Sequence, residues 1–218
     1  MNQTAVIFDM DGVICHTNPY HSLAFKSFFG KRNLFPSEEQ FAQHMYGKSN
    51  SYILKHFLGR EVVGQEFLDL EFEKESLFRE IYASHIETIP HFLTFLEALK
   101  EAGFKTGVAT SAPRANLDLI MGQLGFQKDM ESIMASENVS QHKPHPEVYL
   151  KSAQNLGVSP QNCLVFEDSF SGVSAGLNAG MRVVGVLSSH TIEELPQCSA
   201  YINDYSEIDI ETVFNIIK

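Results

Sequence analysis

The chain has 218 residues, of which 44% are hydrophobic and 20% are charged, and its formal net charge is −11. This length predicts one or two domains, and the composition excludes a disordered or collagen-like chain. Because nucleic acids and anionic membranes are bound through clustered positive charge, we expect so acidic a chain to bind neither of them.

The cysteines and the start of the chain indicate a compartment. Cys15, Cys163 and Cys198 are not spaced as a zinc site or a disulfide framework. The first residues lack the basic and apolar regions of a signal peptide, and no apolar run approaches the roughly 18 residues of a membrane span. We therefore expect a cytoplasmic protein without a membrane partner.

Short apolar segments in the chain have the character of buried parallel strands. They cover residues 5–8, 105–109, 163–166 and 182–187. A continuous apolar run is typical of a strand that is buried on both faces, as in a parallel sheet. The first three of these segments run directly into polar residues that are capable of chemistry.

Helical patterns that end near a glycine separate the later strands. They cover residues 91–102, 116–124, 146–156 and 171–179, and residues 205–218 are expected to form a last amphipathic helix that packs on the core. The alternation of strand and helix predicts an α/β fold with a doubly wound parallel sheet. In such a fold the functional site lies at the carboxyl ends of the strands.

The sequence between Asp9 and Thr110 is too long for one crossover connection of about 30 residues. It contains helical patterns and no convincing strand. The helical patterns cover residues 21–29, 37–44, 51–57 and 65–84. We therefore expect a helical domain at residues 16–86, inserted into a core domain that is formed by residues 1–15 and 87–218.

Carboxylates follow two of the predicted strands. Asp9 and Asp11 follow the first strand with a period of two, and Glu167 and Asp168 follow the third. Carboxylates crowded at buried strand ends repel one another and need a cation, and oxygen ligands suit Mg²⁺. The alternatives are two solvated aspartates in the first loop and a helix N-cap at Asp168 or Ser169 in the second.

A hydroxyl pair and a lysine complete the expected strand edge. Thr110 and Ser111 stand between a strand and a helix, where such groups bind phosphate or simply cap the helix. Lys143 lies on a loop that is stiffened by two prolines, and there it could neutralise the carboxylates and an incoming phosphate together. The ordinary alternative is a solvated lysine.

The order and spacing of these segments resemble the four motifs of the haloacid dehalogenase (HAD) superfamily. The segments are DMDGV at 9–13, VATS at 108–111, KPHPE at 143–147 and FEDSFSG at 166–172. The stretch SGVSAGLNAGMR at 171–182 resembles the Mg²⁺-dependent phosphatase and β-phosphoglucomutase-like branch. The resemblance implies a Rossmann-like HAD core with an inserted α-helical cap domain. It disfavours the dehalogenase branch, whose members lack the second aspartate of the first motif.

The resemblance also implies roles for the motif carboxylates. Asp9 would be the nucleophile that forms an aspartyl-phosphate, and Asp11 would be the general acid and then the general base. Mg²⁺ would be held by Asp9, the backbone carbonyl of Asp11 and Asp168, with Glu167 assisting. The cation would offset the repulsion between the anionic nucleophile and the anionic phosphate.

The same resemblance assigns the phosphate contacts. The Thr110 hydroxyl and the backbone N–H of Ser111 would bind phosphate oxygens, and Lys143 would bridge Asp9 and the phosphate. Arg114, at the start of the next helix, could reach a second phosphate, although a solvated arginine at a helix start is the favoured reading.

Residues of the insertion would bind the substrate. Thr17 and His21 match positions that face the site in the β-phosphoglucomutase family, although His21 could equally be a helix-surface histidine. Gly47, Lys48 and Asn50 match the stretch with which the mutase holds its distal phosphate.

That stretch favours hydrolysis over mutase activity. Tyr46 and Asn50 stand where the mutase has lysine and arginine, which leaves Lys48 as the only nearby cation. Loss of the forked arginine donor is not a conservative change. A mutase also needs a second anion site in order to turn a bisphosphate around.

The predicted function is a Mg²⁺-dependent phosphatase, a phosphoric monoester hydrolase acting on a small phosphorylated metabolite, with a sugar phosphate preferred. The alternatives are a β-phosphoglucomutase-like phosphohexomutase and an inorganic pyrophosphatase. A non-catalytic phosphate-binding module is disfavoured, because such a module could lose the nucleophile at no cost to its folding. We expect a monomer or a weak homodimer.

Overall fold

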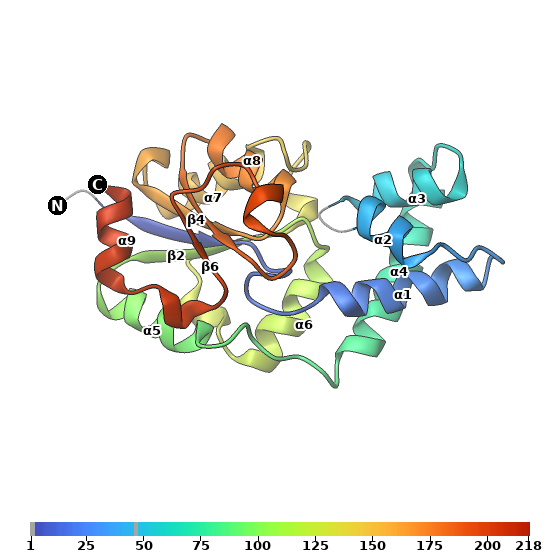
Figure 1. Ribbon diagram of the computed structural model, residues 1–218, viewed down its shortest axis with the longest axis horizontal. Coiled ribbons are helices and arrows are strands. Elements are labelled where there is room, and N and C mark those ends of the chain that lie inside the picture. Colours follow the sequence, from blue (N-terminus) through green and yellow to red (C-terminus); the bar gives the residue numbers. More distant parts are fainter. Residues whose placement is uncertain (1–2, 46–47) are drawn as a thin grey trace. The chain divides into compact units, whose positions relative to one another are not determined.

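The apolar run Ala5–Phe8 forms β1, a central strand of a six-stranded parallel sheet with the order β3-β2-β1-β4-β5-β6 (Figure 1). The other strands are β2 (Lys105–Ala109), β3 (Ser132–Met134), β4 (Cys163–Glu167), β5 (Arg182–Val186) and β6 (Ala200–Ile202). Every residue of β1 and β4 is buried, as expected for strands covered on both faces. The computed structural model describes residues 3–45 and 48–218.

The sheet confirms the predicted fold class and adds two strands to it. The strands that the sequence analysis missed, β3 and β6, have three residues each and lie at the two edges of the sheet. Segments this short carry no periodicity that separates them from loops. Because the chain runs from β1 to β2 and β3 and then returns to β4 on the other side, the strand order reverses beside β1. This switch point is where ligands bind in open α/β sheets.

Helices cover both faces of the sheet in the core unit (Figure 1). They are α5 (Phe92–Glu101), α6 (Arg114–Leu124), α7 (Glu147–Leu156), α8 (Phe170–Asn178) and α9 (Ile210–Ile217). On one face, α7 and α8 bury an aliphatic cluster that includes Ile7 and Val165. On the other face, the Phe92 ring of α5 packs edge-on against Phe8, with 5.3 Å between the ring centroids.

The expected single helix over residues 205–218 is wrong, because an aspartate divides it. Residues Tyr205–Glu207 form one 3₁₀ turn, and α9 begins only at Ile210. The Asp209 carboxylate accepts the backbone N–H of Thr212 at 2.8 Å, which caps the new helix. The apolar side of α9 is buried as expected, at Val213 and Ile217.

The chain divides into two compact units, which are Met1–His16 with Glu87–Lys218 and Thr17–Ile86. The second unit contains α1 (Asn18–Gly30), α2 (Glu38–His44), α3 (Asn50–Leu58) and α4 (Gly64–Tyr82), as the helical patterns predicted. Its core is aromatic and includes Phe25, Phe28, Phe29 and Phe41. We propose that the two units are two domains.

The two chain segments that lead to and from the second unit pair with each other inside the core unit. Cys15 and Thr88 form an antiparallel bridge, and the Ile89 N–H donates to the Ile14 carbonyl at 2.7 Å. The inserted unit therefore leaves and re-enters the core at neighbouring points. Among the described helices, none is long and apolar enough to cross a membrane.

Candidate active site

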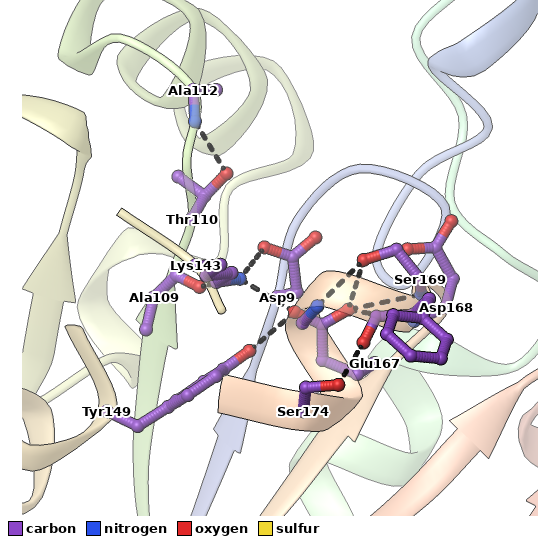
Figure 2. Close-up of polar contacts among 12 residues, drawn as sticks. Asp9, Ala109, Thr110, Ala112, Lys143, Tyr149, Glu167, Asp168, Ser169 and Ser174 are labelled. Atoms are coloured by element: carbon purple, nitrogen blue, oxygen red, sulfur yellow. Dashed lines mark hydrogen bonds and ion pairs between the residues drawn. The ribbon is translucent and has the colours of Figure 1, made fainter. Parts of the chain in front are cut away.

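Three carboxylates meet at the carboxyl edge of the sheet. Asp9 directly follows β1, Glu167 is the last residue of β4, and these strands are paired neighbours in which Phe8 lies beside Phe166. One carboxylate oxygen from each of Asp9, Glu167 and Asp168 lies within 4.8 Å of the others, and all three residues are buried. Figure 2 shows the three side chains gathered around one point. The structure thus brings together three of the four carboxylates that the sequence singled out.

Lys143 is the counter-ion of this cluster. Its ammonium donates to Asp9 Oδ1 at 2.6 Å, to Glu167 Oε1 at 2.7 Å and to the Ala109 carbonyl at 3.1 Å. These contacts use all three of its N–H donors. The side chain is only 5% exposed, and the ammonium lies 4.9 Å from the centre of the Tyr149 ring. The solvated alternative for Lys143 is therefore wrong.

Glu167 is fully engaged by protein donors. Its Oε1 accepts the Tyr149 hydroxyl at 2.7 Å in addition to Lys143. Its Oε2 accepts the backbone N–H of Asp168 at 3.0 Å and both the N–H and the hydroxyl of Ser169 at 3.3 Å. A carboxylate held in this way is oriented more rigidly than one facing water, so Glu167 anchors Lys143 in place.

Tyr149 is a residue that the sequence analysis missed. It lies in the first turn of α7, two residues after the KPHPE segment, and this closeness in sequence to Lys143 could have pointed to it. We predict that Tyr149→Phe lowers the free energy of unfolding by about 1–3 kcal/mol, because a buried bond to a carboxylate is lost. Urea unfolding measures this difference. Tyr52→Phe is the control, and equal losses in the two variants would contradict the prediction.

The electrostatics of the cluster favour a bound cation. Burial, with the charges of Glu167 and Asp11, raises the pKa of Asp9 to about 7, although Lys143 lowers it. Burial, with the charges of Glu167 and Asp9, likewise raises the pKa of Asp168 well above its usual value. When ionised, these carboxylates outnumber the ammonium of Lys143, which contacts Asp9 and Glu167. Such a buried set of hard oxygen donors fits a divalent cation such as Mg²⁺.

The raised pKa of Asp9 predicts a pH-dependent effect of the metal on stability. The ordinary value is 3.8, so between about pH 4 and pH 7 the folded protein holds a proton that the unfolded chain releases. Stability of the metal-free protein therefore falls as the pH rises through this window. Since a cation binds the ionised form, Mg²⁺ should raise the melting temperature more at about pH 8 than at about pH 5.5. An equal or opposite Mg²⁺ effect at the two pH values in thermal unfolding would contradict this expectation.

The loop after β1 is shaped by Gly12. Its φ of +72° is left-handed, and a Cβ at this position would lie 2.0 Å from Asp168 Oδ2. A glycine is therefore required at the point where the β1 and β4 loops touch. The Asp11 side chain is half-buried, and its charge acts on Asp9, but it lies outside the group that Asp9, Glu167 and Asp168 form within 4.8 Å of one another. The expected metal contact of the Asp11 backbone carbonyl stays a prediction.

Of the three residues after β2 that were expected to bind phosphate, Thr110 is buried, and Ser111 and Arg114 are exposed. The Thr110 hydroxyl oxygen accepts the Ala112 N–H at 3.0 Å, an arrangement that leaves the hydroxyl proton to be donated (Figure 2). Arg114 forms an ion pair with Asp118 at 2.7 Å on the exposed side of α6, which is the solvated helix-start position. Phosphate contacts of these residues stay predictions.

His21 lies in an unexpected setting within the second unit. Its Nδ1 is 2.8 Å from the ammonium of Lys74, and its ring stacks on Phe78 with 3.8 Å between the ring centroids. Lys74 is buried in α4, where it also contacts Glu75 at 2.8 Å. His21 is half-buried, so one side of its ring packs against α4 while part of the residue stays at the surface of α1. Thr17, directly before α1, is fully buried.

The other expected substrate residues of this unit differ in their surroundings. Both amide hydrogens of Asn50 are directed to carboxylates, that of Glu71 at 3.0 Å and that of Glu75 at 2.8 Å. Lys48 is exposed, with its ammonium 5.8 Å from the centre of the Tyr52 ring. Gly47 and the adjoining Tyr46 lie outside the described residues.

The sheet, its switch point and the carboxylate–lysine cluster together define a doubly wound α/β protein whose buried acidic cluster is compatible with a divalent cation. The family model of haloacid dehalogenase-like hydrolases matches residues 6–186. The chain therefore belongs to the haloacid dehalogenase-like hydrolases and is an enzyme of that family, which confirms the resemblance drawn from the four motifs.

Individual relatives agree with this assignment. Protein CbbY of Rhodobacter capsulatus is 33% identical over 201 residues, which cover 88% of each chain. A β-phosphoglucomutase of Bacillus subtilis is 31% identical over 189 residues, 84% of this chain and 82% of that one. Among solved structures, a family IA, variant 3 HAD hydrolase of Entamoeba histolytica superposes with a TM-score of 0.91 at 28% identity, covering 99% of both chains.

Proposed function

We propose that this enzyme is a Mg²⁺-dependent phosphatase that hydrolyses a small phosphorylated metabolite, with a sugar phosphate preferred, through an aspartyl-phosphate. The observation that carries the proposal is the contact of 2.6 Å between Lys143 and the buried Asp9 carboxylate, with Asp168 beside it. One ammonium there holds the nucleophile and compensates part of its charge. Membership of the hydrolase family supports the same reaction class.

In the proposed mechanism, Asp9 attacks the phosphorus atom while the bond to the leaving oxygen breaks. Asp11 donates a proton to that oxygen and then accepts one from the water that hydrolyses the aspartyl-phosphate. Thr110 and the N–H of Ser111 bind phosphate oxygens, and Lys143 stabilises the negative charge on them.

Mg²⁺ would be held by Asp9, Asp168 and the backbone carbonyl of Asp11. When bound, it offsets the charges of the nucleophile and the phosphate. Glu167 contributes from outside this set, since both of its oxygens already accept protein donors.

Two observations support hydrolysis over phosphate transfer between two positions of a sugar. A mutase has to hold a second phosphate, which requires hydrogen-bond donors that are not already paired with carboxylates. Both amide hydrogens of Asn50 are committed to Glu71 and Glu75, and Arg114 is paired with Asp118. Of the residues that were expected to bind a second phosphate, this leaves Lys48 as the cation that a mutase would have to use.

The test is phosphate release with Mg²⁺ from sugar phosphates, polyol phosphates, nucleotides and pyrophosphate, with a chelator as the control. β-Glucose 1-phosphate is followed at the same time for conversion to glucose 6-phosphate. Phosphate release from one or a few monoesters is expected. Isomerisation faster than release would establish a mutase, and release from pyrophosphate alone would establish a pyrophosphatase.

A further inference from the structure

The loop after β5 reaches over to the candidate metal site, although it belongs to none of the four motifs. The Ser189 hydroxyl donates to Asp168 Oδ2, and the ring of His190 contacts the Asp168 backbone carbonyl through Nδ1 at 3.0 Å. The Ser188 hydroxyl donates to the carbonyl of Gly12 in the β1 loop. Three consecutive residues thus join the loops that carry Asp9 and Asp168.

The chemistry of these contacts suits the orientation of a metal ligand. A carboxylate that gives one oxygen to a fixed donor is restricted in rotation, and such outer partners typically tune metal affinity. The donor from Ser189 is a neutral hydroxyl, so it orients Asp168 without supplying a positive charge that would compete with a cation. By contrast, the lysine of the cluster contacts Asp9 and Glu167.

The packing leaves little room for Asp168 to move. Its Oδ2, the atom that accepts from Ser189, is also the atom that would lie 2.0 Å from a Cβ at Gly12. Ser188 lies at the same junction, with its Oγ 2.8 Å from that Cβ position. The β1, β4 and β5 loops therefore meet around one carboxylate oxygen.

We propose that Ser189 is a positioning residue, which fixes the Asp168 carboxylate for the divalent cation and thereby sets the affinity of the site. This inference rests on the metal site of the proposed function. It goes beyond that function in assigning part of the metal affinity to the β5 loop.

The experiment measures Mn²⁺ binding to the full chain by electron paramagnetic resonance, without substrate. Ser189→Ala is expected to bind Mn²⁺ about tenfold more weakly than the wild type. Ser189→Thr keeps the hydroxyl and should restore most of the affinity. Ser174→Ala is the matched control, because its hydroxyl donates only to the Phe170 carbonyl on α8, at 2.7 Å. It should bind Mn²⁺ as the wild type does.

A second readout separates positioning from a general loss of structure. In phosphate release, Ser189→Ala should need about tenfold more Mg²⁺ for half-maximal rate and reach nearly the wild-type rate at saturation. Equal Mn²⁺ affinity in Ser189→Ala and the wild type overturns the inference and leaves the phosphatase intact. Equal weakening in Ser174→Ala also overturns it. A wild type that binds no Mn²⁺ overturns the proposed metal site itself, and the inference with it.

Discussion

Asp9→Asn should abolish phosphate release, with a fall in rate of roughly 10⁴-fold or more, because the amide is not a nucleophile at phosphorus. The two side chains have nearly the same shape, and the amide oxygen can still accept from Lys143. The variant should therefore fold normally. Since burial raises the pKa of Asp9 to about 7, its ionised form costs the metal-free protein stability above that pH. A neutral amide avoids this cost, so the metal-free variant should melt no lower than the wild type at about pH 8.

Loss of activity without loss of stability separates a nucleophile from a structural residue. The measurements are phosphate release with Mg²⁺ and thermal unfolding in a chelator. Asp118→Asn makes the same chemical change on the exposed side of α6 and is the control that should retain activity. An Asp9→Asn variant that releases phosphate at the wild-type rate would exclude the aspartyl-phosphate. A variant that is inactive but unfolded would leave Asp9 with a structural role.

The residues of the candidate site could be predicted from the sequence wherever a reactive residue follows a central strand. Asp9 and Asp168 come after the apolar runs of β1 and β4, and adjacent parallel strands end at the same edge. The meeting of their carboxylates follows from the fold class alone. The sequence singled out Lys143 because it lies on a loop that is stiffened by two prolines. Its ion pairs with Asp9 and Glu167 explain why it is buried.

The contacts that the sequence did not reveal depend on partners from distant segments. In the sequence, Ser189 looks like an ordinary loop serine. Its contact with Asp168 is revealed only by the pairing of β5 with β4. Lys74 lies in a charged stretch of α4 that is typical of a solvated helix face, yet it is buried against His21. Asn50 was expected to contact substrate, and the sequence did not reveal that its amide also donates to Glu71 and Glu75. No local pattern encodes such pairings, because each is decided by how whole elements pack.

Lys143→Met should have the largest effect on stability. The carboxylates of Asp9 and Glu167 raise the pKa of Lys143 above its usual value although burial lowers it, so the ammonium stays charged at neutral pH. Removing it leaves buried carboxylates without their counter-ion, which costs about 3–5 kcal/mol of unfolding free energy in the metal-free protein. Protonation can relieve the uncompensated charge, so the loss should be smaller at about pH 5 than at about pH 8. Phosphate release should also fall by about 10²–10³-fold, because the positive charge that stabilises the phosphate beside Asp9 is lost.

Urea unfolding at the two pH values, in a chelator and then with Mg²⁺, tests this prediction for Lys143. Lys151→Met is the matched control, since Lys151 is exposed where it pairs with Glu147 on α7, and its loss should cost less than about 1 kcal/mol. Mg²⁺ should restore part of the stability lost in Lys143→Met, because the cation takes over charge compensation among the carboxylates. A loss that is independent of both pH and Mg²⁺ would mean that Lys143 stabilises the fold by packing. The charge balance that makes Asp9 a nucleophile would then have to come from the metal alone.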